Sequence, residues 1–271
     1  MTTSSQTTSQ NLYPPCFAGA DVGASRTKVA VIDADGYMLG YCVDRSGTDF
    51  SATADRCLTE ALAMADIKKD RIARTISTGY GRKNVSYAQD YRTEISCHGK
   101  GCFHYFPFAI TIIDIGGQDN KIIKLDENGK RTSFKMNRKC AAGTGAFLEE
   151  MSPRLDIPLT EMNGLAAAST NMVKLGSFCT VFSATEVLEN IRRGKRVEDI
   201  VKGLFFSVIS RIREMDAFTE KVVMTGGVVA HNPYLVEMTQ ELISRPILVP
   251  DLPQFTGALG AALYARETFE N

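Results

Sequence analysis

The sequence has no excess of charge of either sign. Its 31 lysine and arginine residues balance 31 aspartate and glutamate residues, which gives a formal net charge of zero. No basic patch or charged tail stands out, so a nucleic-acid partner is not indicated. Long hydrophobic runs are also lacking. The longest, such as FAITII (108–113), are far too short to cross a bilayer, so no membrane partner is expected.

The N-terminal segment lacks the basic start and the apolar core of a signal peptide. The first dozen residues are polar and low in complexity, and we predict a disordered tail over residues 1–15. A cytoplasmic location is therefore expected.

None of the cysteine spacings is CxxC, which argues against a zinc ribbon or a thioredoxin motif. The seven cysteines are Cys16, Cys42, Cys57, Cys97, Cys102, Cys140 and Cys179. In an unsecreted chain they are not expected to form disulfides, and the first three are interpreted as buried structural residues. Cys97 and Cys102 lie beside His98 and His104. These atoms suit zinc, yet packing is the favoured interpretation.

An internal repeat predicts the architecture. DVGASRTKVAVIDADG (21–36) and DIGGQDNKIIKLDENG (114–129) share aspartate, glycine, lysine, aspartate and glycine at the same five offsets. Each segment predicts a strand, a glycine-containing turn, a second strand and a tight turn into a third. The sequence therefore predicts two similar lobes, each beginning with a β-hairpin.

The repeated hairpins suggest phosphate binding. Asp21 and Asp114 each end an apolar strand and stand two residues before a glycine. A glycine turn lets phosphate oxygens approach the main chain closely, and aspartate binds Mg²⁺, usually through water. A single DxG sequence is explained as well by a tight turn. In duplicate, it favours two hairpins that grip a polyphosphate from both sides.

Two further glycine clusters follow. In VVMTGGVVAHN (222–232) a strand runs into Gly226 and Gly227, which suits a backbone lying against a nucleoside. FTGALGAALYA (255–265) begins the last predicted helix with small residues. Close helix packing explains that second cluster at least as well as ligand contact.

The motifs together resemble a known family. Two DxG hairpins followed by TGG resemble the superfamily of acetate and sugar kinases, heat-shock chaperones and actin. STGYGR, IDIGGQD, KCAAGTG, CTVFSATEV, MTGG and GALGAALYA resemble the ATP-dependent activators of 2-hydroxyacyl-CoA dehydratases and the ATPase subunits of benzoyl-CoA reductases. The resemblance covers about residues 17–266.

This resemblance implies an α/β fold in which two similar lobes of the actin-like, ribonuclease H-like type enclose a nucleotide cleft. Lobe I would span residues 16–107 and include the C-terminal helix 255–268. Lobe II would span residues 108–250.

The resemblance also implies that Cys140 and Cys179 bind a 4Fe–4S cluster at a dimer interface, with two thiolates from each protomer. Both cysteines stand at or just before a predicted helix start, where unpaired N–H groups stabilise a thiolate. The residues alone leave a ligand and a buried structural cysteine as equal alternatives.

The implied reaction is ATP hydrolysis that drives a low-potential electron into a partner dehydratase or reductase. The cofactors would be ATP or ADP, Mg²⁺ and the shared cluster. The dimer would pair two copies, or this chain with a paralogous ATPase subunit. A ferredoxin- or flavodoxin-like donor would supply the electron.

Asp21 and Asp114 are predicted to hold the Mg²⁺–phosphate group, and Gln118 or Glu186 to orient the attacking water. Lys28 is a weaker candidate, because its offset points along the second strand. Further predicted contacts are the backbone of Gly23, Ala24, Gly116 and Gly117 with phosphate, and Gly226 and Gly227 with adenosine. Gly143, Thr144 and Gly145 would touch phosphate or let the Cys140 helix start close to the cluster.

Two other functions are compatible with this fold. A small-molecule kinase of the sugar or acetate type would need a substrate pocket and would have no use for cysteines at two helix starts. A non-enzymatic nucleotide switch would bind ATP and a partner without carrying an electron. Ala146 departs from the larger basic residue expected after GTG in the activators, but this departure removes no proposed ligand.

Overall fold

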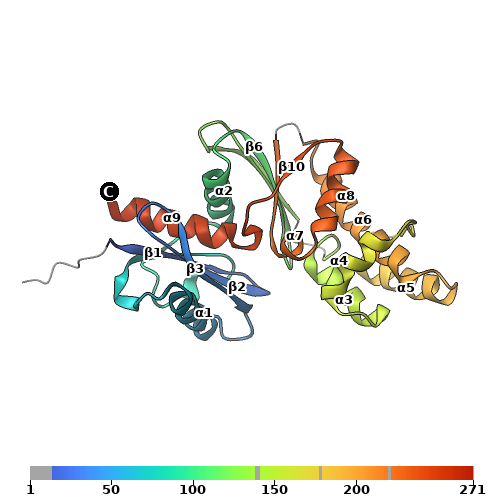
Figure 1. Cartoon of the computed structure of the whole chain (residues 1–271), viewed down its shortest axis with the longest axis horizontal. Helices are drawn as coiled ribbons and strands as arrows, with labels where there is room; N and C mark the ends of the chain where they lie inside the picture. Colours follow the sequence, from blue (N-terminus) through green and yellow to red (C-terminus); the bar gives the residue numbers. More distant parts are fainter. Residues whose placement is uncertain (1–13, 138–140, 177–178, 219–220, 271) are drawn as a thin grey trace, which may run out of the picture.

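The computed structural model describes residues 14–137, 141–176, 179–218 and 221–270 (Figure 1). Up to residue 105 the elements are β1 (Cys16–Val22), β2 (Arg26–Ile32), β3 (Met38–Arg45), α1 (Phe50–Ala65), η1 (Lys69–Arg71), β4 (Ile72–Thr78), η2 (Arg82–Asn84), β5 (Asp90–Tyr91) and α2 (Glu94–Tyr105). The remaining elements are β6 (Ile110–Ile115), β7 (Asn120–Leu125), β8 (Arg131–Asn137), α3 (Gly145–Leu155), α4 (Leu159–Ala168), α5 (Thr180–Arg192), α6 (Val197–Met215), β9 (Lys221–Thr225), α7 (Gly227–His231), α8 (Pro233–Ile243), β10 (Ile247–Leu248), η3 (Pro253–Phe255) and α9 (Thr256–Glu270).

The strands form two sheets with one topology. The first sheet has the order β3-β2-β1-β4-β5, with β1 antiparallel to β2 and parallel to β4. The second has the order β8-β7-β6-β9-β10, with β6 antiparallel to β7 and parallel to β9. Every strand of the first sheet has a counterpart in the same place in the second. The predicted repeat of two lobes, each beginning with a hairpin, is confirmed.

The first sheet buries both of its faces. Ala18, Ala20 and Val22 of β1 pack in one cluster with α1, whereas Phe17 packs in another with α9. Because successive side chains of a strand point to opposite faces, Asp21 lies on the same face as Phe17. The sequence alternation therefore directs this aspartate toward α9.

The second sheet also buries both of its faces. Ile113 and Ile115 of β6 belong to the largest core cluster, which includes residues of α3, α6 and α8. Ile110 and Ile112 pack on the opposite face in a cluster with α2. By alternation, Asp114 lies on the face of the second sheet that α2 covers.

Helices α2 and α9 form the layer that joins the two sheets. Helix α9 packs on β1, β2 and β4, whereas α2 packs on β6, β7 and β8 and also against α9. The two helices cross at contact distance, because a methyl group at Gly260 would lie 1.8 Å from the Cys97 carbonyl oxygen. At Gly101 a methyl group would lie 2.0 Å from the Thr256 oxygen. Gly260 therefore allows the two helices to pack closely, which was one of the two interpretations of the glycine cluster 255–265; ligand contact was the other.

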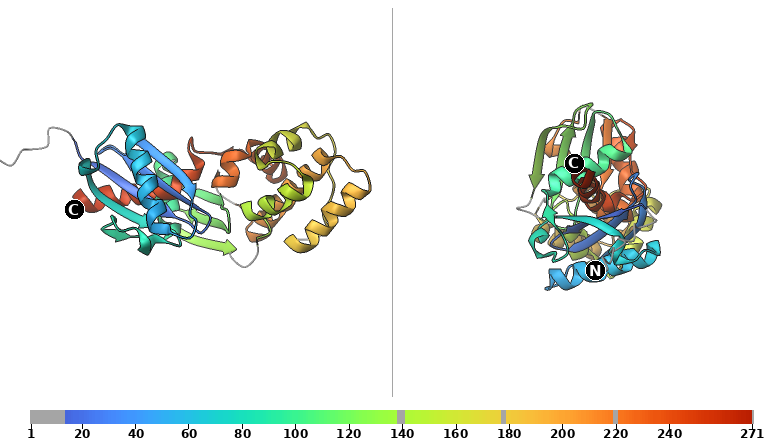
Figure 2. Two further views of the ribbon diagram at one scale, coloured as in Figure 1. Left: turned by 90° about the horizontal axis from the view of Figure 1, so that it is seen from below. Right: turned by 90° about the vertical axis from the view of Figure 1, so that its left-hand side faces the viewer.

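The second lobe extends away from the first. Figure 2 shows α5 at the end of the molecule opposite the C-terminus. Among the described residues, none of the helices combines the length and the apolar character that a membrane span requires. The predicted lobe boundaries, at residues 107/108 and 250/255, stay predictions.

Candidate functional site

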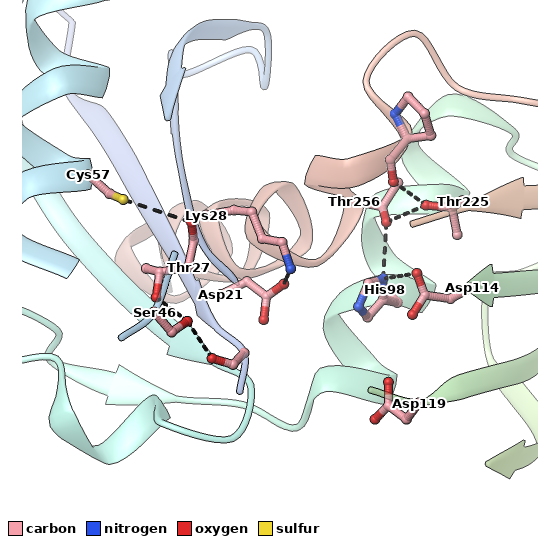
Figure 3. Close-up of polar contacts among 12 residues, drawn as sticks. Asp21, Thr27, Lys28, Ser46, Cys57, His98, Asp114, Asp119, Thr225 and Thr256 are labelled. Atoms are coloured by element: carbon pink, nitrogen blue, oxygen red, sulfur yellow. Dashed lines mark hydrogen bonds and ion pairs between the residues drawn. The ribbon is translucent and has the colours of Figure 1, made fainter. Parts of the chain in front are cut away.

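Two aspartates from the two lobes face the same space. Asp21 near the end of β1 and Asp114 near the end of β6 are 4% and 2% exposed, and they occupy matching places in the repeat. Figure 3 shows their carboxylates on either side of the His98 ring. Buried carboxylates require compensating partners, so the neighbouring cations determine what this pair can do.

Each aspartate has a lysine directly across the hairpin. Lys28 pairs with Asp21 in the β1–β2 register, and its Nζ lies 3.4 Å from Asp21 Oδ2. Lys121 occupies the same place in β7, with its Nζ 3.0 Å from Asp114 Oδ2. Residues paired across a strand ladder point to the same face. Lys28 therefore lies beside Asp21, a contact that an offset pointing along the second strand did not predict. Lys121 was not predicted, although the repeat places a lysine seven residues after each aspartate.

The electrostatic balance at Asp114 favours the carboxylate. Burial opposes ionisation, but His98, Lys121 and Lys28 outweigh it and lower the pKa of Asp114 to about 2. Burial also opposes the charge on Lys121, whereas Asp114, Glu94 and Asp119 raise the pKa of this lysine above its usual range. Asp119 Oδ1 lies 2.6 Å from Lys121 Nζ. Asp114 and Lys121 are therefore a stable buried ion pair at neutral pH.

The turns of the two hairpins have the same construction. The N–H of Gly23 donates to Arg26 O at 3.0 Å, and that of Gly116 donates to Asp119 O at 2.9 Å. These two amides are therefore already bonded within the turns. The two glycines favour a ligand site only because they carry no side chain.

The tips of the two turns meet. A methyl group at Gly117 would lie 3.0 Å from Ser25 Oγ of the opposite lobe. Ala24 and Gln118, at these tips, are exposed. The structure therefore brings together the predicted phosphate-binding residues of both lobes.

Each aspartate also has one further glycine in close contact with it, Gly226 beside Asp114 and Gly79 beside Asp21. Gly226 has φ 103°, and a methyl group there would lie 2.4 Å from Ile115 O and 2.8 Å from Asp114 Oδ1. Gly79 at the end of β4 has φ 88°, and a methyl group would lie 2.7 Å from Asp21 Oδ1. A role for Gly79 was not predicted, although STGYGR and MTGG share the Thr-Gly pair that signals it.

We expect Gly226→Ala to destabilise the protein more than Gly194→Ala. Both glycines have positive φ, but nothing lies within 4 Å of a methyl group at Gly194. The backbone strain of Gly194→Ala costs about 1–2 kcal/mol, whereas the clash at 226 adds roughly 1–3 kcal/mol. Urea unfolding of the two variants measures the difference, and equal losses would contradict the crowding beside Asp114.

The start of α3 and the residues just before it are bonded to the second hairpin. The amides of Gly145 and Ala146 donate to carbonyl oxygens of the β6–β7 turn at 2.9 and 2.8 Å, and Asn120 Nδ2 donates to Gly143 O at 2.7 Å. Thr144 is buried, and its hydroxyl donates to a backbone carbonyl. Because the amides of Gly145 and Ala146 are already bonded, the geometry favours a structural connection here over direct phosphate contact.

The structure describes one of the two predicted cluster cysteines. Cys140 lies outside the described residues. Cys179 is exposed and is the N-cap residue of α5, as predicted from its place upstream of a helix. Glu186, on the same helix, accepts a hydrogen bond from the Gly176 amide at 2.7 Å. The structure therefore places Glu186 beside the Cys179 segment, on the helix farthest from the first lobe, and does not bring it to the two aspartates (Figure 2).

The two cysteines of α2 do not converge. Cys97 belongs to the cluster with α9, whereas Cys102 belongs to the cluster on the second sheet. Burial raises the pKa of Cys97 to about 12 and also raises that of Cys102. Within the described ranges, no group of three or more His, Cys, Asp or Glu side chains is arranged to hold a metal ion.

Comparison with known proteins shows the family of the chain. Residues 18–265 match the BadF/BadG/BcrA/BcrD ATPase family. The chain belongs to this family. Its place there makes it an ATPase, and both repeated segments, 21–36 and 114–129, lie within the matched range.

Individual relatives cover almost the whole chain. The activator of lactoyl-CoA dehydratase from Anaerotignum propionicum is 42% identical over 92% of this chain and 96% of its own length. The crystal structure of (R)-2-hydroxyglutaryl-CoA dehydratase component A from Acidaminococcus fermentans superposes with a TM-score of 0.90, at 37% identity, over 95% of this chain and 100% of that one. The activator of 2-hydroxyisocaproyl-CoA dehydratase from Clostridium difficile, solved with bound ADPNP, has a TM-score of 0.87 at 38% identity over 94% and 96%. The predicted family and the actin-like ATPase fold are confirmed.

Proposed function

We propose that this ATPase hydrolyses ATP to drive a low-potential electron into a 2-hydroxyacyl-CoA dehydratase. The observation that carries the proposal is the pair of buried aspartates that face each other from two repeated hairpins. The names of relatives near 40% identity support an activator of a dehydratase. A subunit of a benzoyl-CoA reductase is the alternative within the same family.

The cleft residues fit a magnesium nucleotide. Two buried carboxylates can take up hydrated Mg²⁺, which neutralises phosphate charge when bound, and the glycine turns leave room for phosphate oxygens. Asp21 and Asp114 would hold the metal, with the Nζ atoms of Lys28 and Lys121 beside them at 3.4 and 3.0 Å. Gln118, exposed at the tip of the second turn, would orient the attacking water. The backbone of Ala24 and Gly117 would contact phosphate, Gly23 and Gly116 would leave room for its oxygens because their own amides are bonded within the turns, and Gly226 and Gly227 would contact adenosine.

Cys179 fits a shared iron–sulfur cluster. It is exposed at the start of a thirteen-residue helix, where a cluster shared with another chain could reach it. Helix α5 also exposes Val181 and Phe182, 72% and 66%, together with Leu188. An exposed apolar helix face beside the cysteine is typical of a surface covered by another chain. Cys140 and Cys179 of two copies would together supply the four thiolates of one 4Fe–4S cluster, which carries one electron when bound.

The contacts between the hairpin and α3 would couple the two sites. Closure of the cleft around nucleotide moves the β6–β7 turn, and the bonds of Gly145 and Ala146 to that turn require α3 to follow. Helix α3 in turn packs against α5, which begins after Cys179. The electron would arrive from a ferredoxin- or flavodoxin-like donor and pass to the dehydratase.

The test is the iron and acid-labile sulfide content of protein purified without oxygen, measured with its molecular mass in solution. About two irons and two sulfides per protomer in a dimer are expected. A cluster that forms only with a paralogous subunit would favour the reductase alternative. Protein that stays free of iron under all conditions would contradict the electron-transfer proposal.

A further inference from the structure

His98 lies between the two aspartates, at the junction of both lobes. It belongs to α2, and its ring is buried. Nδ1 lies 3.0 Å from Thr256 Oγ1 at the start of α9 and 3.8 Å from Asp114 Oδ1 (Figure 3). On the other side of the ring, a methyl group at Gly257 would lie 3.1 Å from both His98 Nε2 and Asp21 Oδ2. The ring therefore fills the space between a carboxylate of lobe I and a carboxylate of lobe II.

The protons of this network can be followed through its hydrogen bonds. Thr225 at the end of β9 donates its hydroxyl proton to Pro253 O. Because that proton is used, the 2.8 Å contact between the two threonine hydroxyls has Thr256 as its donor. Thr256 Oγ1 must then accept a proton from His98 Nδ1. The N–H at Nδ1 is therefore fixed by the chain itself, and Nε2 is directed toward the Asp21 side.

The network connects elements that would otherwise move independently. Asp114 and Thr225 are neighbours across β6 and β9 of the second sheet, whereas Asp21 belongs to the first sheet. His98 is anchored to Thr256, and α2 and α9 are the layer between the sheets. A side chain fixed in that layer is in contact with one cleft carboxylate and next to the other.

We propose that His98 is a positioning residue that sets the spacing of Asp21 and Asp114 for the magnesium ion. The inference rests on the proposed function, because it gives the two aspartates the metal. His98 acts through the hydrogen bond from its Nδ1–H to Thr256 Oγ1. This bond fixes the orientation of the ring between the carboxylates. Loss of the bond leaves the phosphate-binding turns in place but lets the carboxylates lose their spacing.

Three substitutions separate this role from simple packing. His98→Ala removes the ring, His98→Asn retains a donor near the position of Nδ1, and His98→Gln retains an amide near the position of Nε2. ADP binding is measured by calorimetry with magnesium and with EDTA, and the ratio of the two affinities is the readout. His104→Ala, on the same helix but outside this network, is the control. Thermal unfolding and iron content monitor the fold, and Thr256→Val tests the acceptor if His98→Ala does not fold.

We expect His98→Ala, His98→Gln and Thr256→Val to lower the magnesium-dependent gain in ADP affinity about tenfold. His98→Asn should retain most of the gain, and binding in EDTA should be unchanged in all of them. The inference would be overturned if His98→Asn and His98→Gln had the same ratio of ADP affinities, or if the ratio in His98→Ala were that of the wild type. In either case, magnesium-dependent binding of ADP by the wild-type protein would leave the proposed function intact. A wild-type protein that binds no ADP at all would overturn both.

Discussion

Asp114→Asn should reduce ATP hydrolysis at least about a hundredfold while the iron content of the protein stays at the wild-type level. The substitution preserves the shape of the side chain, removes its charge and replaces one acceptor oxygen by an amide group. Lys121 Nζ lies 3.0 Å from the Asp114 carboxylate, whose pKa is lowered to about 2. An uncharged amide at this place holds Mg²⁺ poorly, so the loss should appear in kcat measured at saturating nucleotide.

The stability of this variant should fall only modestly. Lys121 loses one counterion but keeps Asp119, whose Oδ1 lies 2.6 Å away. We expect a loss of about 1–3 kcal/mol in the free energy of unfolding, less than the roughly 3–5 kcal/mol caused by an uncompensated buried charge. Asp126→Asn is the matched control, because Asp126 lies in the next turn of the same lobe and its Oδ1 accepts only backbone N–H groups. Hydrolysis by Asp114→Asn at the rate of the control would remove Asp114 from the site.

The hairpin that begins each sheet could be predicted because its information is local. The five shared offsets in residues 21–36 and 114–129 fix the strand, the turn and the register within sixteen residues. The period of two along β1 then decides which face carries Asp21. The same register places Lys28 opposite Asp21, and attention to cross-strand pairs in place of linear offset would have predicted that contact.

His98 could not be predicted, because its role depends on three distant segments. Its partners Asp114 and Thr256 are brought to it by the crossing of α2 and α9, which depends on glycines at 101 and 260. In the sequence, His98 appears only as a neighbour of Cys97 and Cys102, where packing was favoured over a metal site. Glu186 shows the converse error. Its closeness to Cys179 in the chain suggested catalysis, but α5 holds it away from the cleft.

Cys179→Ser should abolish most of the iron content while ADP affinity stays within about twofold of wild type. A serine hydroxyl does not ionise near neutral pH and is a poor ligand for a cluster that is usually bound by four thiolates. Cys179 is exposed, so the substitution should change the free energy of unfolding by no more than about 0.5 kcal/mol. Loss of iron could then not be attributed to unfolding.

Cys42→Ser is the matched control for this experiment. Cys42 is buried on β3 of the first lobe, where its thiol donates to Glu60 Oε2 at 3.0 Å, a bond that a serine hydroxyl can also make. Iron, sulfide and the visible spectrum of both variants should be measured after purification without oxygen. Because Asp114 lies on β6 and Cys179 caps α5, Cys179→Ser and Asp114→Asn should each remove one property and spare the other. A full complement of iron in Cys179→Ser would show that the thiolates come from elsewhere, whereas loss of iron in Cys42→Ser would mean that iron content reports on the fold and not on the ligands.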